Sequence, residues 1–395
     1  MTSTDNPVLP AENPGPAAEA DTGSEEPVAL VFHGHSDLKV TIQTSNNDQK
    51  VYMVCASSLA CASPIWRSML DCGASDGLDA EDATKQGRIQ TMELNGDGDA
   101  IALLFYIIHY DFSRVPKAPS LDQLFEICKS ANQYKCTRIL YPWVNQWISR
   151  LANFAAEEDV HHECHKVLYV AWTFGDLKLF REMVDALIIS TKIDVNGKVV
   201  NTSGQLLEQM LMPLELLDTI TDVRASTVAK VLDIIKTPID DLSRGTRTQP
   251  GTYCKVGKSS QECEIMMLGS VIPALIKAGL FPVPGSETYT DSIVNLKDTL
   301  DNVKTKPFVG KDWMPHLSHE HCNLGFREAV LKCVKAMEVP LGKSIMSWMS
   351  VQAQTCGIEA TTELEEWRLG AEASSLDDAE NTHHVANQES PVDED

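Results

Sequence analysis

Three cysteines and one histidine in the second half of the chain are of the residue types that bind zinc. Cys254 and Cys263 are separated by eight residues, and His319 and Cys322 by two. A structural zinc ion is held in a tetrahedron of four nitrogen or sulfur ligands. We therefore predict that the two pairs join distant segments of the chain through one structural zinc ion.

Two alternatives to this site remain open from the sequence alone. The first keeps the metal but exchanges the histidine, with His316 or His321 in place of His319. The second has no metal, because the gap between Cys254 and Cys263 is longer than the two to four residues usual in zinc-binding pairs. In that case the cysteines are buried thiols and the histidines lie on the surface.

A second group of histidines lacks the spacing of a catalytic zinc site. His161 and His165 are four residues apart and would share one face of a helix. Zinc proteases need His-Glu-x-x-His, but after His162-Glu163 the position of the second histidine is Lys166. This group therefore predicts an exposed helix start.

Two Gly-Lys-Ser sequences fail the pattern of a phosphate-binding loop. They begin at Gly257 and Gly342, and the pattern needs another glycine five residues earlier, where the chain has Thr252 and Met337. No motif pairs a nucleophile with a base in a recognisable way. We therefore expect a protein that is not an enzyme, with a metal-dependent enzyme at the Cys/His cluster as a remote alternative.

The negative charge of the chain is concentrated at its two ends. The formal net charge is −23 over 395 residues. Residues 1–30 carry −6 and residues 359–395 carry −11, which leaves −6 for residues 31–358. Acidic segments without an apolar pattern predict solvated, disordered tails. A net-acidic body without a basic stripe argues against direct nucleic-acid binding.

The first thirty residues and the cysteine content predict an intracellular protein. Residues 1–30 contain no Lys or Arg and no apolar run, so they resemble neither a signal peptide nor a transit peptide. No apolar stretch reaches the ~18 residues of a membrane helix. The 11 cysteines are odd in number and widely spaced, which indicates reduced thiols. We expect a cytoplasmic or nuclear location and no membrane partner.

The segment from residue 37 to 151 predicts a small sheet covered by helices. Alternating apolar residues predict three strands, the first two in a hairpin, at 38–42, 50–54 and 89–94. Apolar residues at helical spacing predict helices at 58–70, 97–110, 120–132 and 137–151. Pro142 is awkward inside the last of these helices, which can start there instead. This order of elements predicts an α+β unit.

The remainder predicts a mostly α-helical region. The helical segments are 164–174 and 176–189, divided by Gly175, then 202–211, 213–235, 263–280, 290–305 and 324–350. We therefore predict a disordered acidic tail at 1–30, the α+β domain at 31–150, a helical domain at 151–242, a helical region with the Cys/His clip at 243–358, and a second disordered acidic tail at 359–395.

Several short motifs occur together between residues 37 and 147. They are Asp37 at the first strand, Tyr52 and Val54 in the second, Leu59, Ser63-Pro64 and Trp66 in the first helix, the run Ile107-Ile108-His109, and Pro142-Trp143. Together they resemble the BTB/POZ domain, in the version common in fungal proteins. The resemblance implies a BTB/POZ fold that has no reactive centre and works by binding other proteins. Residues 151–240 are similar to the helices that follow this domain in such proteins.

Two positions depart from the family's pattern. Many members carry a histidine and then a basic residue after the second strand, where this chain has Cys55 and Ala56. In the family, the basic residue faces the strand aspartate at a dimer interface. Asp37 therefore lacks its usual counter-charge, which argues against the usual homodimer.

The resemblance implies two candidate faces for partners. The face of the first helix and the strand edge contributes Asp37, Leu59, Ile65, Trp66, Met69 and Leu70. The helix pair 97–110 and 120–132, where some relatives bind a cullin-type ubiquitin-ligase scaffold, contributes His109, Tyr110 and Phe112. The alternative is that these residues are ordinary core and surface.

The expected function is that of a protein–protein interaction adaptor. Its first form is a substrate adaptor of a cullin-type ubiquitin ligase. The alternatives are a self-associating scaffold and a transcription regulator that depends on a DNA-binding partner.

Overall fold

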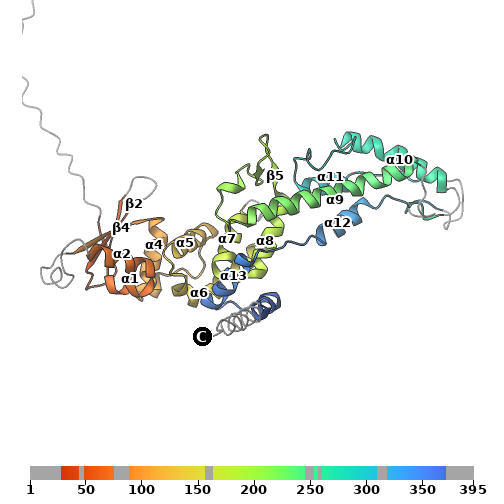
Figure 1. Cartoon of the computed structure of the whole chain (residues 1–395). Coiled ribbons are helices and arrows are strands. Elements are labelled where there is room, and N and C mark those ends of the chain that lie inside the picture. The colour runs from red at the N-terminus through yellow and green to blue at the C-terminus, as the bar shows by residue number, and fades with distance from the viewer. Residues whose placement is uncertain are drawn as a thin grey trace, which may run out of the picture.

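The computed structural model describes residues 28–43, 49–74, 89–155, 163–244, 253–256, 260–308 and 318–370. Within them the chain is mixed α+β and mostly helical, as predicted, with one four-stranded sheet and a separate two-stranded hairpin. The molecule is elongated: the sheet lies at one end, and a bundle of long helices extends from the middle to the other end (Figure 1).

The sheet begins with the predicted hairpin of β2 (Leu38–Gln43) and β3 (Gln49–Val54). β4 (Gln90–Asn95) pairs with β2 in parallel, and the short β1 (Leu30–Val31) pairs with β3, so the order is β1-β3-β2-β4. Alternate residues of β2 are buried and their neighbours are not, which confirms the period of two in the sequence. β1 was not predicted, and both of its residues are exposed.

The single helix predicted after β3 is two helices, α1 (Ala56–Ala62) and α2 (Pro64–Ala74). They break at Ser63, whose buried hydroxyl donates to the carbonyl of Tyr134 and accepts from the amide of Trp66. The backbone amide at the first position of a helix has no acceptor within the helix. Pro64, which lacks an amide hydrogen, is therefore well suited to the start of α2. The break turns Trp66 into the core beneath the sheet.

Three further helices complete this domain, α4 (Gly98–Ile108), α5 (Leu121–Gln133) and α6 (Tyr141–Ala155), with single turns η1 (Phe112–Arg114) and η2 (Thr137–Leu140) between them. Asp97 caps α4 through the amide of Ala100, and Ser120 with Gln123 forms a capping box on α5. α6 starts at Tyr141, so Pro142 lies in its first turn, where a proline is tolerated.

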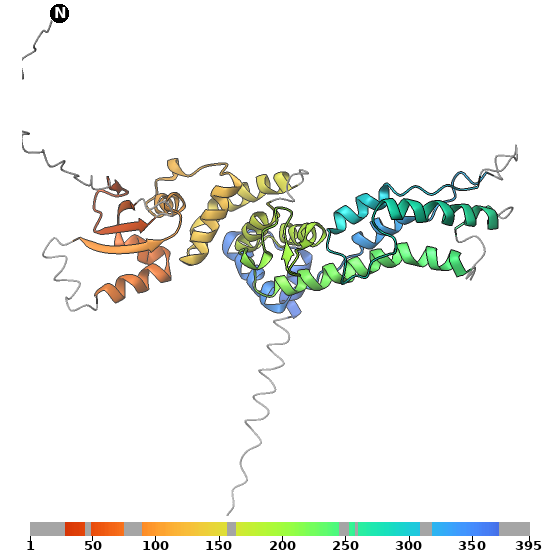
Figure 2. The same cartoon turned by 90° about the horizontal axis from the view of Figure 1, so that it is seen from above.

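The chain continues into α7 (Cys164–Phe174) and α8 (Leu177–Ser190), divided at Gly175 as predicted. Far along the sequence, α13 (Lys343–Cys356) returns to pack on α7, α6 and η2 (Figure 2). At the crossing, a Cβ on Gly175 would lie 2.2 Å from the backbone nitrogen of Ala353, and the φ of Gly175 is +81°. Only glycine fits this position.

Between α8 and α13 lies the part of the chain that we call the helical arm. It contains α9 (Leu216–Arg244), α10 (Ser260–Lys277), α11 (Ile293–Asp301) and α12 (Phe326–Lys335), and it extends away from the sheet (Figure 1). The 29 residues of α9 span about 43 Å at the usual rise per residue. The buried guanidinium of Arg224 on α9 donates to the carbonyls of Thr191 and Asp291, which fixes the base of the arm.

Two predicted helices are wrong. The segment 202–211 is not helical: β5 (Lys192–Ile193) and β6 (Val199–Val200) form a hairpin, followed by the single turn η4 (Leu207–Gln209). The segment 324–350 is two helices, α12 and α13, because Pro340 and Gly342 interrupt it.

The predicted boundaries at the C-terminal end also change. Residues 243–358 are not a unit of their own, since α13 packs on α7 of the preceding region. The predicted tail at 359–395 starts too early, because residues 362–370 are helical and Leu364 is fully buried. Arg181 on α8 forms an ion pair with Glu363 and donates to the carbonyl of Val339. The predicted tail at 1–30 lies mostly outside the described residues, and the part described ends at Leu30, the first residue of β1.

Within the described residues, none of the helices combines the length and apolar character needed to cross a membrane.

Candidate metal centre and partner-binding groove

The four residues predicted to bind zinc lie together at the end of the helical arm farthest from the sheet. Their ligand atoms, the Sγ atoms of Cys254, Cys263 and Cys322 and a ring nitrogen of His319, all lie within 4.8 Å of one another. All four residues are buried. His319 has only 3% of its surface exposed, which is rare for a histidine without a structural role.

Three separate segments position these side chains. Cys254 lies between α9 and α10, and Cys263 lies in the first turn of α10. His319 and Cys322 belong to one tight turn before α12, closed by a bond of 2.8 Å from the amide of Cys322 to the carbonyl of His319. This turn brings the two side chains to the same side, so the cluster links the α9–α10 connection to the segment before α12.

The donor distances fit a tetrahedral ion. Zinc–sulfur bonds of about 2.3 Å and zinc–nitrogen bonds of about 2.0–2.1 Å place sulfur atoms about 3.8 Å apart, and sulfur about 3.6 Å from nitrogen. The Sγ atoms of Cys254 and Cys322 are 3.9 Å apart. Nδ1 of His319 lies 3.3 Å from the first sulfur and 3.9 Å from the second. The residues can therefore hold one zinc ion.

Burial and the neighbouring thiols raise the pKa of Cys254 and Cys263, so these two thiols are hard to ionise by themselves. Burial raises the pKa of Cys263 to about 12, and the neighbouring Cys254 and Cys322 add to the effect. Burial also raises the pKa of Cys254. A divalent cation among the sulfur atoms reverses this preference, because it stabilises thiolates directly.

Of the two alternative histidines, His321 is exposed and does not belong to the cluster. His316 lies outside the described residues. Of the second histidine group, His161 is also outside them, and His165 is half-buried with its pKa lowered by burial. Gly342 is the N-cap of α13, where Ser344 donates to the carboxylate of Glu215, so this sequence binds an acidic side chain of its own chain.

One catalytic motif was overlooked in the sequence. Residues 73–77 read Gly-Ala-Ser-Asp-Gly, the letters of a hydrolase nucleophile turn. That motif requires a strand before the serine, and here Gly73 and Ala74 end helix α2. Ser75 itself lies outside the described residues.

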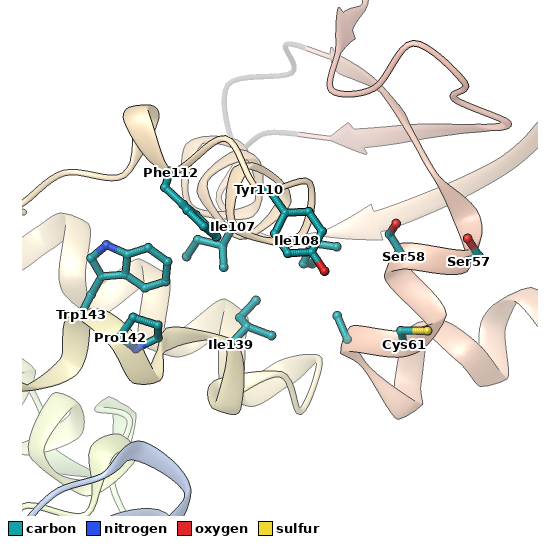
Figure 3. A pocket seen from close by; sticks show the side chains of 11 residues that line it. Ser57, Ser58, Cys61, Ile107, Ile108, Tyr110, Phe112, Ile139, Pro142 and Trp143 are labelled. Carbon is teal, nitrogen blue, oxygen red and sulfur yellow. The ribbon is translucent and has the colours of Figure 1, made fainter.

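A second site lies on the N-terminal domain, where an open groove of about 440 Å³ separates α1 from η2 and α6 (Figure 3). Its walls are mainly apolar and come from three places in the sequence. The lining residues are Ser57, Ser58, Cys61 and Ala62 of α1, Ile107, Ile108, Tyr110 and Phe112 around the end of α4, and Ile139, Pro142 and Trp143 of η2 and α6.

Aromatic rings form one side of this groove. Phe112 packs edge-on against Trp143 at 5.5 Å between centroids, and against Tyr110 at 5.9 Å. Tyr110 is 80% exposed and Phe112 51% exposed, so both rings face solvent. The φ of Tyr110 is +64°, a left-handed conformation that is uncommon for a tyrosine.

His109 does not line the groove but joins the end of α4 to the residue that precedes α1. Its Nδ1 atom bonds to the carbonyl of Phe105 at 2.8 Å, and its Nε2 atom accepts from the amide of Cys55 at 3.0 Å. This pattern requires the neutral imidazole with its proton on Nδ1. Burial lowers the pKa of His109, and the nearby His33 adds to the effect.

The predicted face on the first helix is wrong for two of its six residues. Leu59 and Trp66 are fully buried in the core, where Trp66 stacks on Tyr134 at 5.1 Å. Ile65 and Leu70 are half-buried, and Met69 is 37% exposed. Asp37 is exposed, and it does have a partner: its carboxylate accepts from the amide of Ala56 at 2.8 Å. The backbone of α1 thus replaces the basic side chain that the resemblance implied.

Sequence reasoning found Tyr110 and Phe112 but missed the rest of the groove. Trp143 was named as part of the Pro142-Trp143 motif and Cys61 had no role, although both line the groove. No local signal marks them, because the groove forms only when η2 packs on α4 and brings Trp143 of α6 against Phe112.

No family model matches the chain, and no curated protein matches it either.

Proposed function

We propose that this chain is a non-enzymatic adaptor that binds a partner protein through the groove between α1, α4 and α6. The observation that carries the proposal is the group of exposed rings on an otherwise apolar wall. Aromatic residues next to an apolar pocket are the usual anchors of protein interfaces. Tyr110 is 80% exposed and Phe112 51%, and both rings lie next to the apolar wall, where a partner can cover them.

The order of elements supports an N-terminal domain of the BTB/POZ type. The hairpin β2–β3, helices α1 and α2, strand β4 parallel to β2, and then α4, α5 and α6 follow the order that the resemblance implies. Most large apolar side chains of this domain lie in its core, and the exposed rings of Tyr110 and Phe112 line the groove. We propose that the partner is a cullin-type scaffold, with the helical arm available for a substrate.

The backbone at Tyr110 supports a binding role for its ring. A left-handed tyrosine is strained by about 1 kcal/mol, and asparagine or glycine would relieve that strain. No described hydrogen bond uses the Tyr110 hydroxyl, and the ring contacts only Phe112 among the aromatic side chains of the described residues. The tyrosine is therefore explained better by an external contact than by stability.

The test is affinity purification of tagged full-length protein at native expression, followed by mass spectrometry. The variants are Tyr110→Asn, which suits the left-handed backbone, and Phe112→Ala. We expect stoichiometric recovery of a cullin, reduced at least tenfold by either variant, since anchor residues carry about 2 kcal/mol or more. Leu214→Ala, at a residue 96% exposed and remote from the groove, is the control.

Two results would count against this proposal. The first is recovery of other proteins without a cullin, in amounts that still depend on Tyr110 and Phe112. This result would reject the cullin as partner and keep the groove as the binding site. Recovery that neither variant changes would reject the groove.

We also propose that the Cys₃His cluster binds one structural zinc ion. Four buried protein donors fill a tetrahedron and leave no open position for water or substrate, which favours a structural over a catalytic site. The ion would tie the α9–α10 connection to the turn before α12.

Metal analysis of the purified protein tests this assignment. We expect about one zinc per chain, lost in Cys322→Ser and kept in Cys333→Ser, a matched change of a half-buried thiol on α12 outside the cluster. Metal-free protein with unchanged stability would reject the zinc site.

A further inference from the structure

The outer face of α10 is apolar along most of its length. Its inner face buries Cys263, Met267, Val271 and Leu275 against the arm. Between Glu262 and Lys277 every exposed residue is apolar: Ile265, Met266, Gly269, Pro273 and Ile276. Ile265 is 61% exposed and Ile276 is 56% exposed. Single exposed apolar residues are ordinary, but an uninterrupted stripe marks a contact surface.

The stripe is symmetric about Gly269. At 100° per residue, Ile265 and Pro273 lie one turn to either side of this glycine, and Met266 and Ile272 flank it on opposite edges. A Cβ on Gly269 would meet nothing within 4 Å, so the glycine is not required by contacts inside the chain. A glycine at the centre of an exposed helix face allows another backbone to approach closely.

The charges at the two ends of the stripe are opposite. Glu262 lies at the N-terminal end of the face and Lys277 at the C-terminal end, and both are exposed. When two copies of α10 lie antiparallel with Gly269 over Gly269, Glu262 of each copy lies beside Lys277 of the other, offset by one residue. The helix dipoles also oppose each other in this arrangement. The same face therefore complements itself in shape, polarity and charge.

We propose that α10 pairs with α10 of a second copy of this chain, antiparallel and centred on Gly269. A twofold axis places identical patches against each other, as in most homodimers. The contact involves one helix of 18 residues from each copy, so it falls at the small end of protein interfaces and forms a weak, reversible dimer. This surface is separate from the groove on the N-terminal domain, and its use does not depend on the partner proposed there.

The test is sedimentation velocity of the full-length protein over a range of concentrations up to about 100 µM, where small interfaces associate. We expect reversible dimers for the wild type. Glu262→Lys and Lys277→Glu should each raise the dissociation constant by about tenfold, since each turns two attractive pairs into repulsive ones.

Mixing the two variants is the decisive measurement. In a mixed dimer, both positive positions of one copy face both negative positions of the other, so affinity returns to the wild-type level or above. Val195→Glu, at a fully exposed residue on the β5–β6 hairpin, is the control and leaves the dimer unchanged.

Zinc content and far-ultraviolet circular dichroism confirm that each variant is folded. A wild type that stays monomeric up to the highest concentration would overturn the proposal. Dimers that persist in both charge variants and show no preference for mixed pairing would also overturn it, because they would form through another surface.

Discussion

The N-terminal domain and the helical arm are stabilised in different ways. The domain buries a dense set of large side chains around Trp66, Phe105 and Trp147 beneath a sheet. The arm is a few long helices, and the buried aromatic side chains among its described residues are Phe326 and the ring of His319. A domain with a thick core holds itself together by apolar burial, whereas a thin helical extension needs an additional link at its end. The Cys₃His cluster lies where such a link is needed.

The largest expected loss of stability comes from a change in the core of the N-terminal domain, and it tests whether this core folds independently of the helical arm. Trp66→Ala removes a fully buried indole and should destabilise the N-terminal domain by about 3–5 kcal/mol. Zinc content should remain at the wild-type level, because the cluster is far from this core. Chemical denaturation followed by metal analysis measures both. Loss of zinc in this variant would show that the two regions fold as one unit.

A second change should affect both regions, because it lies where they meet. In Gly175→Ala, the new Cβ would clash with the backbone of Ala353, and a left-handed φ adds strain. We expect a loss of about 3 kcal/mol or more, with the thermal transition of the whole chain lowered. Gly204→Ala, which also has a positive φ but no atom within 4 Å of its Cβ, is the control and should cost about 1 kcal/mol.

Two helix-capping residues, one in each region, allow the stability of the two regions to be compared, because loss of either cap costs a similar free energy locally. Asp97 caps α4 in the N-terminal domain, and Ser292 caps α11 in the arm. Changing either residue to alanine should cost about 1 kcal/mol. We expect Asp97→Ala to lower global stability and Ser292→Ala to raise hydrogen exchange only within the arm. Equal effects on global stability would contradict the difference between the two regions.

The smallest effect is a pH dependence confined to the N-terminal domain. Burial lowers the pKa of His109 below its usual 6.5, so the folded state favours the neutral ring. The stabilisation is fully present above the unfolded pKa and is lost as pH falls from 6.5 towards the lower folded value. The melting temperature of the wild type should therefore fall more steeply than that of His109→Gln over this range. Parallel curves would show that His109 does not contribute.

The sequence predicts a helix or strand well where its apolar residues recur with one period and all face the same core. β2 was found because alternate residues face the core, and α5 because apolar residues at helical spacing follow Ser120, a capping residue. β1 is too short and too exposed to produce a pattern. The β5–β6 hairpin had a signal that was passed over: Asn196-Gly197 is a turn sequence, and Asp194 accepts from the amides of Asn196 and Lys198.

The sites were predictable to different degrees for a physical reason. Thiols and imidazoles are rare and chemically specific, so Cys254, Cys263 and Cys322 could be named without a fold. The choice of His319 over His321 depends on a tight turn that only the structure supplies. Leu59 and Trp66 were assigned to a binding face because an apolar helix residue has the same pattern whether it contacts its own core or a partner.

Hydrogen exchange of the full-length protein, with and without removal of zinc by a chelator, tests the central claim most directly. We expect removal of one zinc per chain to raise exchange in residues 260–277 and 318–335 and to leave β2, β3 and α4 unchanged. Exchange that is the same throughout the chain after chelation, or protein that contains no zinc and is already protected in the arm, would contradict the account.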